Sequence, residues 1–454
     1  MKLAVVGAGW AGMAAAVTAA DQGADVTVFE ASRVLGGRAR AVPLTRPDGR
    51  PLVLDNGQHI LIGAYCKTLT LMQHVGVDLD AALQALPLGL PRPDGTGLQT
   101  PGWAAHWPAP LDTLAGIATA RGWTWGDRLA LLRAALRWRV QGFACHPGLT
   151  VAQLCEDLPP AVIDGLIEPL CVSALNIPGA QASAQVFLNV LRDALFGQGH
   201  ASLRPAHLLL PRTDLSELMP QTAARWLQAQ HPGRARICTG TRVRAITPVA
   251  TGWALQTEQD GALTEATFHR VIWATPAGAA AQAVAQAAAA ARACGQDTLA
   301  TPLDTWGRSA RSLAHTAIAT VYLFAPGQAL HAPLLALPVG PNAPAQFVFD
   351  RGQLQPQEAS AQGVLAFVVS AATGSREALQ AAVLRQAGEQ LGLHDLQAIQ
   401  TVVERRATFA CTPGLQRPAM TVAAGLQAAG DYVDGPYPAT LEGAVRSGIR
   451  AALA

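Results

Sequence analysis

The chain opens on a glycine-rich turn that joins an apolar strand to a helix. Its residues, Lys2-Leu-Ala-Val-Val-Gly7-Ala-Gly9-Trp-Ala-Gly12, carry the spacing Gly-x-Gly-x-x-Gly directly after the strand. A second predicted strand, Val26-Thr-Val-Phe-Glu30, ends in an acid 18 residues after Gly12. This order of strand, turn, helix, strand and acid is the βαβ unit that binds a dinucleotide. We therefore predict an α/β chain built around a Rossmann-like nucleotide-binding domain.

Each glycine of the turn has a physical role in that unit. Gly7 permits the tight turn, Gly9 lets backbone N–H groups approach a pyrophosphate, and Gly12 allows helix and strand to pack closely. The positive end of the helix faces the phosphate charge. Glu30 is placed to accept hydrogen bonds from the ribose of an adenosine.

Two further segments indicate which dinucleotide is bound. Gly36-Gly37-Arg38 follows Glu30 closely and adds backbone amides and a guanidinium for the same pyrophosphate. Near the other end, an apolar stretch closes on Gly430-Asp431, and a short helix rich in alanine begins near Leu441. These segments resemble the FAD-binding turns of the amine oxidase and phytoene desaturase superfamily.

The resemblance implies FAD as the cofactor and gives these residues roles. It implies that the carboxylate of Asp431 meets the ribityl or phosphate region and that the helix from Leu441 starts beneath the isoalloxazine. The positive end of that helix would stabilise negative charge on reduced flavin. The strand-like segment from Ala235 to Ile246 is similar to the second nucleotide-binding segment of FAD oxidoreductases, which implies that the backbone near Val243 meets the adenine.

Composition narrows the class of protein. Of the 454 residues, 50% are hydrophobic and 14% are charged, which is enough apolar material for a large core. The formal net charge of +2 gives no basis for a nucleic-acid partner.

The seven cysteines form no Cys-x-x-Cys pair, which fits a reducing compartment and predicts no metal site. No long uninterrupted apolar run predicts a membrane-spanning helix, so we expect a cytoplasmic chain that at most contacts the inner face of the cytoplasmic membrane.

The predicted domains are discontinuous along the chain. We assign 1–63, 205–292 and 414–454 to the FAD-binding domain, and 64–204 and 293–413 to the substrate-binding domain. The stretch from Thr68 to Ser202 reads as mostly helical, with proline and glycine interruptions. Alternating strands at 316–324, 346–350 and 364–370 add a sheet, so the substrate domain mixes helices and strands.

Five segments go beyond the superfamily pattern. They are 54–65, which contains Asp55-Asn-Gly57-Gln58-His59, then 168–176, 210–218, 407–413 and 437–448. Together they resemble the squalene-associated FAD desaturase-type family, the hydroxysqualene dehydroxylases of bacterial hopanoid synthesis, over nearly the whole chain. One departure is Tyr432, where the family pattern has tryptophan.

The resemblance implies reduction of a C30 isoprenoid, hydroxysqualene, to squalene. Hydroxide is a poor leaving group, so an acid must protonate the allylic alcohol before water departs. Reduced flavin then delivers a hydride to the allylic carbon, in a site that excludes bulk water. The sequence shows no second Gly-x-Gly-x-x-Gly, so the donor of electrons to the flavin stays unassigned.

In the superfamily, the turn at Asp55-Asn-Gly57 passes beside the flavin ring. The resemblance therefore places Gly57 at the cofactor and makes Gln58 and His59 the candidate catalytic residues. A free imidazole has a pKa of about 6.5, so we expect His59 to be the proton donor. Two alternatives stay open: the acid is a buried Asp55 or a bound water, or His59 only hydrogen-bonds the backbone.

Two other functions stay open on the sequence alone. A carotenoid-type desaturase or an amine oxidase has the same fold, and a desaturase removes hydride from a lipid instead of adding it. A prenyl-lipid carrier of this fold binds no flavin, although the intact Gly36-Gly37-Arg38 and Gly430-Asp431 segments argue against it. Colour separates these cases, because a flavoenzyme purifies yellow and a carrier purifies colourless.

A basic stretch rich in tryptophan indicates contact with a membrane. Leu129, Leu132 and Leu136 recur at helical spacing and predict one apolar face, and Asp127 is the only acid nearby. The tryptophans are Trp123, Trp125 and Trp138, and the arginines are Arg121, Arg128, Arg133, Arg137 and Arg139. Tryptophan and arginine beside an apolar face suit an anionic bilayer. The alternative is an ordinary helix that packs on the core and leaves its arginines in solvent.

Overall fold

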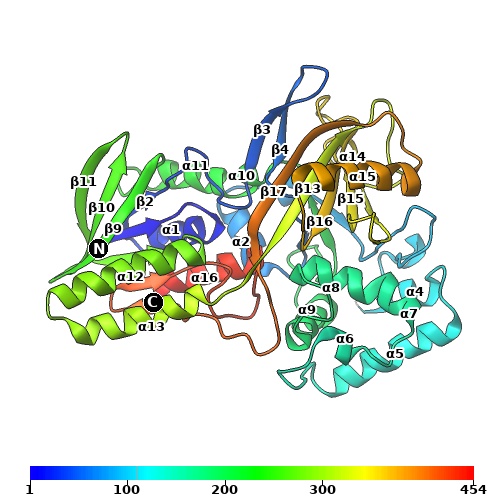
Figure 1. Ribbon diagram of the computed structural model, residues 1–454, viewed down its shortest axis with the longest axis horizontal. Coiled ribbons are helices and arrows are strands. Elements are labelled where there is room, and N and C mark those ends of the chain that lie inside the picture. Colours follow the sequence, from blue (N-terminus) through cyan, green and yellow to red (C-terminus); the bar gives the residue numbers. More distant parts are fainter. Residues whose placement is uncertain (109) are drawn as a thin grey trace.

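Strands from the two ends and the middle of the chain meet in one α/β unit. The structure is a computed structural model, and it describes residues 1–108 and 110–454. Figure 1 shows this unit, which holds both chain termini, beside a second unit made of a sheet and a lobe of helices.

Six strands form the central sheet of the α/β unit, in the order β18-β19-β12-β1-β2-β8. Their bounds are β1 (Lys2–Val6), β2 (Asp25–Phe29), β8 (Ala235–Cys238), β12 (Arg270–Trp273), β18 (Thr421–Ala423) and β19 (Leu426–Ala428). Every neighbouring pair is parallel except β18 and β19. The apolar strands β1 and β12 are almost fully buried, as expected where helices and a second sheet cover a parallel sheet. The predicted Rossmann-like fold is confirmed.

Five helices pack around this sheet, and three of them are rich in alanine. The five are α1 (Trp10–Asp21), α11 (Pro220–Gln230), α12 (Ala277–Ala293), α13 (Asp297–Arg311) and α16 (Leu441–Leu453). At Gly448 of α16, an added Cβ would lie 2.1 Å from the carbonyl oxygen of Ala11 in α1. Helix α13 packs on α12, and its Trp306 indole donates to the carbonyl oxygen of Ala419 at 2.7 Å. Because these contacts join α13 to the α/β unit, we propose a domain boundary after residue 311 instead of after residue 292.

A three-stranded antiparallel sheet extends the α/β unit. Its strands are β9 (Thr241–Val249), β10 (Gly252–Gln259) and β11 (Ala262–Phe268). The segment from Ala235 to Ile246, predicted to be strand-like, is divided between β8 and β9, because the chain turns at Thr239-Gly240. Gly240 has a φ of +62°, and its N–H donates to the carbonyl oxygen of Ser32 at 3.0 Å. Strand β9, which carries Val243, therefore begins beside Glu30.

The second unit is built on a five-stranded antiparallel sheet, in the order β14-β15-β16-β13-β17. The bounds are β13 (His315–Phe324), β14 (Leu334–Ala336), β15 (Phe347–Asp350), β16 (Val364–Ser370) and β17 (Gln397–Phe409), with α14 (Arg351–Leu354) and α15 (Arg376–Leu391). Alternate residues of β13 face opposite sides of the sheet. Ala319, Val321 and Leu323 pack with α15 on one side. Thr320 and Tyr322 therefore point to the other side, toward Asp55 and its neighbours.

The stretch predicted to be mostly helical, 68–202, is mainly helical with one short strand. Residues 66–83 pack on the α/β unit, and the helices from residue 111 onward form a lobe beside it. The elements are α2 (Cys66–His74), α3 (Leu79–Ala82), β6 (Leu83–Leu86), a 3₁₀ turn (Gly102–Ala104), α4 (Leu111–Thr119), α5 (Trp125–Val140), α6 (Val151–Leu154), α7 (Pro160–Val162), a π-helical turn (Ile163–Ile167), α8 (Glu168–Leu175) and α9 (Ala184–Phe196). The amide of Asn176, just after α8, donates to the hydroxyls of Thr316 at 2.8 Å and Thr408 at 3.1 Å. The segment that ends at Asn176 thus joins the lobe to the sheet.

Two small sheets connect the units. The first is the hairpin of β3 (Ala41–Thr45) and β4 (Pro51–Asp55), and the second joins β5 (Leu61–Ile62) and β6 to β7 (Leu208–Pro211), which leads to α10 (Leu215–Leu218). At the hairpin tip, Arg46 donates to the carbonyl oxygen of Ser360 at 2.8 Å, so the hairpin is anchored on the second unit. Strand β4 then delivers residues 55–59 to the junction of the units. Among the described residues, no helix has the length and apolar character needed to cross a bilayer.

Candidate active site

The glycine turn after β1 is shaped for a phosphate. Gly7 has a φ of +105°, and an added Cβ would lie 2.7 Å from the carbonyl oxygen of Ala274, so a larger residue does not fit. A Cβ on Gly12 would lie 1.9 Å from the carbonyl oxygen of Gly7. Gly9 precedes α1, whose first turn holds no acid and receives no cap from any described side chain. The first N–H groups of α1 are therefore available to an anion.

The Gly36-Gly37 turn lies directly against the first glycine turn. The N–H of Gly36 donates to the carbonyl oxygen of Ala8 at 2.9 Å, and Gly36 forms a parallel bridge with Gly9. Gly37 has a φ of +64°, and a Cβ there would lie 3.4 Å from the Cα of Gly9. The two turns bring their backbones together with no side chain between them, as the binding of a pyrophosphate requires.

Glu30 holds the first glycine turn in place. Its Oε2 accepts from the N–H of Ala8 and its Oε1 accepts from the N–H of Ser32, both at 2.8 Å. A carboxylate offers about four lone-pair sites, so two remain for ribose hydroxyls. The ribose contact stays a prediction, and the structure adds a role for Glu30 in shaping the turn.

Arg38 connects the two ends of the chain. Its guanidinium forms an ion pair with Asp431 and donates to the carbonyl oxygen of Ala407 at 2.7 Å. The residue before Asp431, Gly430, donates its N–H to the hydroxyl of Ser447 in α16 at 2.8 Å. The Gly-Gly-Arg turn, the Gly-Asp pair and α16 are therefore fixed around one position.

Helix α16 begins at Leu441, the residue predicted to lie beneath the flavin, which is partly exposed. The hydroxyl of Thr440 caps the helix by accepting from the N–H of Gly443 at 3.0 Å. The next side chain, Glu442, is fully buried and accepts from two N–H groups at the start of α2, at 3.1 and 2.9 Å. The acid in the first turn of α16 thus serves to cap a neighbouring helix.

The segment after β4 is tied to the Gly-Gly-Arg turn. The backbone N–H of Asn56 donates to the carbonyl oxygen of Arg40 at 2.8 Å. The side-chain amide of Asn56 donates to the carbonyl oxygen of Arg38 at 3.2 Å. Gly57 lies beside β13, where a Cβ on it would be 3.8 Å from the hydroxyl of Thr320. Residues 55–59 therefore lie between the predicted FAD contacts and the sheet of the second unit.

His59 contacts the backbone through one ring nitrogen. Its Nδ1 lies 2.8 Å from the carbonyl oxygen of Gly57, which only accepts, so Nδ1 carries the proton of the neutral ring. Burial lowers the pKa of His59, and the charge of Arg38 acts in the same direction. The neutral ring offers Nε2 as an acceptor, so a role as proton donor requires prior protonation at that atom.

Asp55 and Arg351 form a fully buried pair next to this segment. Each is 1% exposed, and Asp55 Oδ2 lies 3.5 Å from Arg351 Nη1, which is also 3.5 Å from Gln58 Oε1. The other carboxylate oxygen accepts from the N–H of Leu215 at 2.8 Å, and the hydroxyl of Tyr322 donates to the Asp55 carbonyl at 2.8 Å. Burial raises the pKa of Asp55 to about 6, and the charge of Arg351 offsets only part of that effect.

Several buried polar atoms of this cluster have no hydrogen-bond partner among the described residues. They are Asp55 Oδ2, Gln58 Nε2, Thr320 Oγ1, Arg351 Nε and Arg351 Nη2. Buried polar groups are nearly always paired, so the cluster marks a place for water or for a polar group of a ligand. The sequence analysis named Asp55 and Gln58 and missed Arg351 and Thr320, because a single residue in or after a strand has no characteristic spacing.

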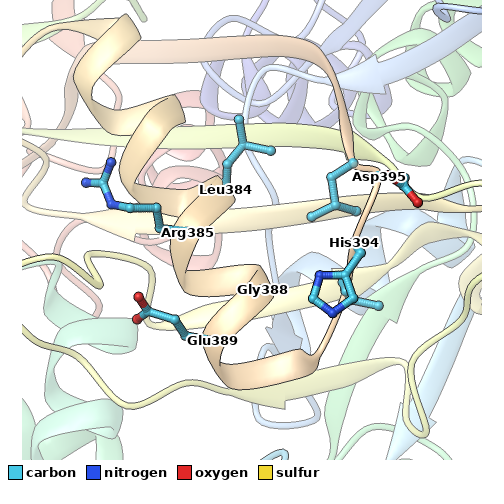
Figure 2. Close-up of a pocket in the computed structure, with 8 residues that line it drawn as sticks. Leu384, Arg385, Gly388, Glu389, His394 and Asp395 are labelled. Carbon is cyan, nitrogen blue, oxygen red and sulfur yellow. The ribbon is translucent and has the colours of Figure 1, made fainter.

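A separate surface pocket lies away from all these residues. Figure 2 shows it between the second half of α15 and the loop that follows, with Arg385, Glu389 and His394 among its lining residues. None of the predicted cofactor or catalytic residues lines it. The candidate site is therefore the junction around Gly9, Arg38 and residues 55–59.

Residues 10–454 match the family model of flavin-containing amine oxidoreductases. The chain belongs to that family. The chain is 29% identical to hydroxysqualene dehydroxylase of Rhodopseudomonas palustris, over 99% of this chain and 96% of that relative. It is 36% identical to zeta-carotene desaturase of Synechocystis, but over only 18% of this chain and 16% of that one. An oxidoreductase from Methanosarcina mazei shares the fold, with a TM-score of 0.70 at 15% identity and full coverage of both chains.

The chain binds FAD as a member of this flavin-containing family, and the residues present fit that group. The uncapped start of α1, the bare contact of the two glycine turns and the Arg38–Asp431 pair supply amides and a cation for a pyrophosphate. The contacts described above link nearly all of the predicted cofactor residues to one another. Val243 is linked to the others through its strand, β9, which begins beside Glu30. The individual contacts with FAD stay predictions.

Proposed function

We propose that this flavoprotein reduces hydroxysqualene to squalene. The observation that carries the proposal is the match to hydroxysqualene dehydroxylase along 99% of the chain. The site supports it as well, because polar atoms of Asp55, Gln58 and Arg351 that have no partner among the described residues are buried beside the predicted flavin position. Such a cluster suits a substrate with one hydroxyl group on an otherwise apolar chain.

The proposed reaction breaks one C–O bond and forms one C–H bond. The alcohol takes up a proton and leaves as water, and FAD, when bound in its reduced form, supplies the hydride that replaces it. The protein must therefore hold the hydroxyl, deliver a proton to its oxygen and keep bulk water from recapturing the allylic cation.

Two residues are candidates for the proton donor. His59 is the residue that the sequence analysis favours, but its lowered pKa leaves the ring mostly neutral near pH 7. Asp55 has a pKa raised to about 6, so about a tenth of it carries a proton near pH 7. Its Oδ2 also lacks a hydrogen-bond partner among the described residues. We keep His59 as the first candidate and add Asp55 as the second.

The proposal is tested by following the product and the direction of electron flow. The protein is reduced anaerobically with dithionite, mixed with hydroxysqualene, and the extract is analysed for squalene by mass spectrometry. Oxidised protein with the same substrate is the control. Squalene formed only by the reduced protein supports the proposal. A desaturase, which shares a short stretch with this chain, would instead oxidise a polyene precursor with oxidised flavin and form no squalene.

A further inference from the structure

Helix α5 exposes an apolar stripe to solvent. Trp125 is 70% exposed, Leu129 47%, Leu136 62% and Val140 80%. Their spacing places them on one face of the helix. On the opposite face, Leu131, Ala134 and Trp138 are buried in the core. The helix is therefore apolar on two sides, and only one of them is used for packing within the chain.

The stripe lies in the part of the chain where exposed apolar side chains are concentrated. Half of the large hydrophobic side chains that are exposed among the described residues fall between 103 and 140. Figure 1 shows α5 at the outer edge of the helical lobe, far from the α/β unit. Two tryptophans that the sequence analysis assigned to a membrane contact, Trp123 and Trp138, are buried and take no part in it.

Arginines flank the stripe. Arg128 lies over the ring of Trp125 at 4.7 Å, and Arg139 lies over the ring of Phe196 at 4.9 Å. Arg133 is exposed on the same helix. The one acid of α5, Asp127, is held by the N-terminal capping box of the helix. The surface thus combines apolar side chains with positive charge, and an occupant should offer apolar contact and negative charge together.

We propose that α5 docks this protein on an anionic bilayer, with the helix lying in the plane of the headgroups. Sixteen residues make a helix about 24 Å long, and its charged and buried sides exclude a spanning orientation. Exposed tryptophan sits at the level of the headgroups, where arginine meets lipid phosphate. The docking goes beyond the proposed reaction, and its test needs no substrate or activity.

Vesicle co-sedimentation of the full-length protein tests the docking. We expect the protein to bind vesicles that contain phosphatidylglycerol and to bind pure phosphatidylcholine vesicles much more weakly. Added salt should weaken the binding, because exposed charges are screened. Replacing one flanking arginine, as in Arg133→Glu, should weaken binding by at least about five-fold.

Paired variants show whether the stripe itself is the contact. Leu129→Ser combined with Leu136→Ser should reduce binding by roughly ten-fold or more, because two leucines no longer enter the lipid. Leu263→Ser is the matched control, since Leu263 is 60% exposed on the distant strand β11. All of these side chains are solvent-exposed, so the melting temperatures should stay close to that of the parent.

Two results would overturn the proposal. One is the absence of binding to phosphatidylglycerol vesicles at low salt by protein that melts normally. The other is a parent chain that sediments as a dimer in analytical ultracentrifugation while the double leucine variant sediments as a monomer, because the stripe would then be an interface between copies. Binding that is lost in the double variant and kept in Leu263→Ser supports the proposal.

Discussion

The guanidinium of Arg38 pairs with the carboxylate of Asp431, although 393 residues separate them along the chain. The side chains are 30% and 9% exposed, so solvent screens the pair only in part. Through this pair, the turn after β2 and the segment before α16 are held at one end of α1. The predicted pyrophosphate position lies between elements that only the folded chain brings together.

Removal of the Arg38 side chain should weaken the binding of FAD. Arg38→Ala leaves Asp431 without its cation and removes a charge from the predicted pyrophosphate contact. We expect a loss of about 1.4–2.8 kcal/mol, which is roughly ten- to one-hundred-fold in affinity. Titration of FAD into the deflavinated protein measures this. Arg33→Ala, at an exposed position in the same loop, is the control. Equal affinities for the two variants would refute the assignment.

Charge reversal at Glu30 should affect both the cofactor and the turn. Glu30→Arg loses two hydrogen bonds of 2.8 Å to backbone N–H groups and puts a cation where the ribose is expected. We expect the variant to purify with much less FAD and to melt at a lower temperature. Glu30→Gln keeps one acceptor oxygen. Its FAD content and melting temperature should lie between those of Glu30→Arg and those of the parent. Full FAD occupancy in Glu30→Arg would show that the ribose lies elsewhere.

The buried Asp55 should make stability depend on pH. Its pKa is about 6 in the folded protein, and a free aspartate has a pKa of about 3.9. Between these values the folded state binds more protons than the unfolded state, so the free energy of unfolding falls as pH rises. The contribution is roughly 3 kcal/mol, lost between about pH 4 and pH 6. Urea unfolding across this range should show the free energy of unfolding of the parent falling relative to that of Asp55→Asn as pH rises, because asparagine stays neutral throughout. Parallel curves for the two proteins would mean that the pKa of Asp55 is not raised in the folded state.

Loss of the His59 imidazole should slow the reaction without loss of the cofactor. His59→Ala removes a single side-chain hydrogen bond among the described residues, to the carbonyl oxygen of Gly57, so we expect the variant to stay folded and yellow. If His59 donates the proton, single-turnover dehydroxylation with pre-reduced flavin should fall by about two decades or more. Asp55→Asn is measured beside it. An unchanged rate in His59→Ala together with a large loss in Asp55→Asn would move the proton donor to Asp55.

Local patterns made the nucleotide-binding end predictable. The motifs there act through backbone geometry over a few residues, so their spacing alone identifies the fold. They are the three glycines, Glu30 and the Gly-Gly-Arg turn. The segment from Ala235 to Ile246 was predicted to be strand-like without the break between its two strands, the turn that Gly240 makes possible. A glycine inside a strand pattern is a signal for such a break.

Side chains that meet across the chain were much harder to predict. Arg351 follows a strand and contacts Asp55, nearly 300 residues earlier, and no pattern in the sequence marks either as a partner. In α5, Leu129 and Leu136 lie in solvent, whereas Leu131 and Trp138 face the core. Both faces are apolar, so helical spacing alone does not decide which one is buried.

Transfer of a hydride from flavin to the carbinol carbon tests the central claim most directly. The flavin is reduced anaerobically in D₂O, where the proton on its N5 exchanges for deuterium, and hydroxysqualene is added for a single turnover. We predict squalene with one deuterium at the carbon that carried the hydroxyl, formed as the flavin spectrum returns to the oxidised state. Oxidation of the flavin without labelled squalene, or recovery of unchanged hydroxysqualene, would contradict the account.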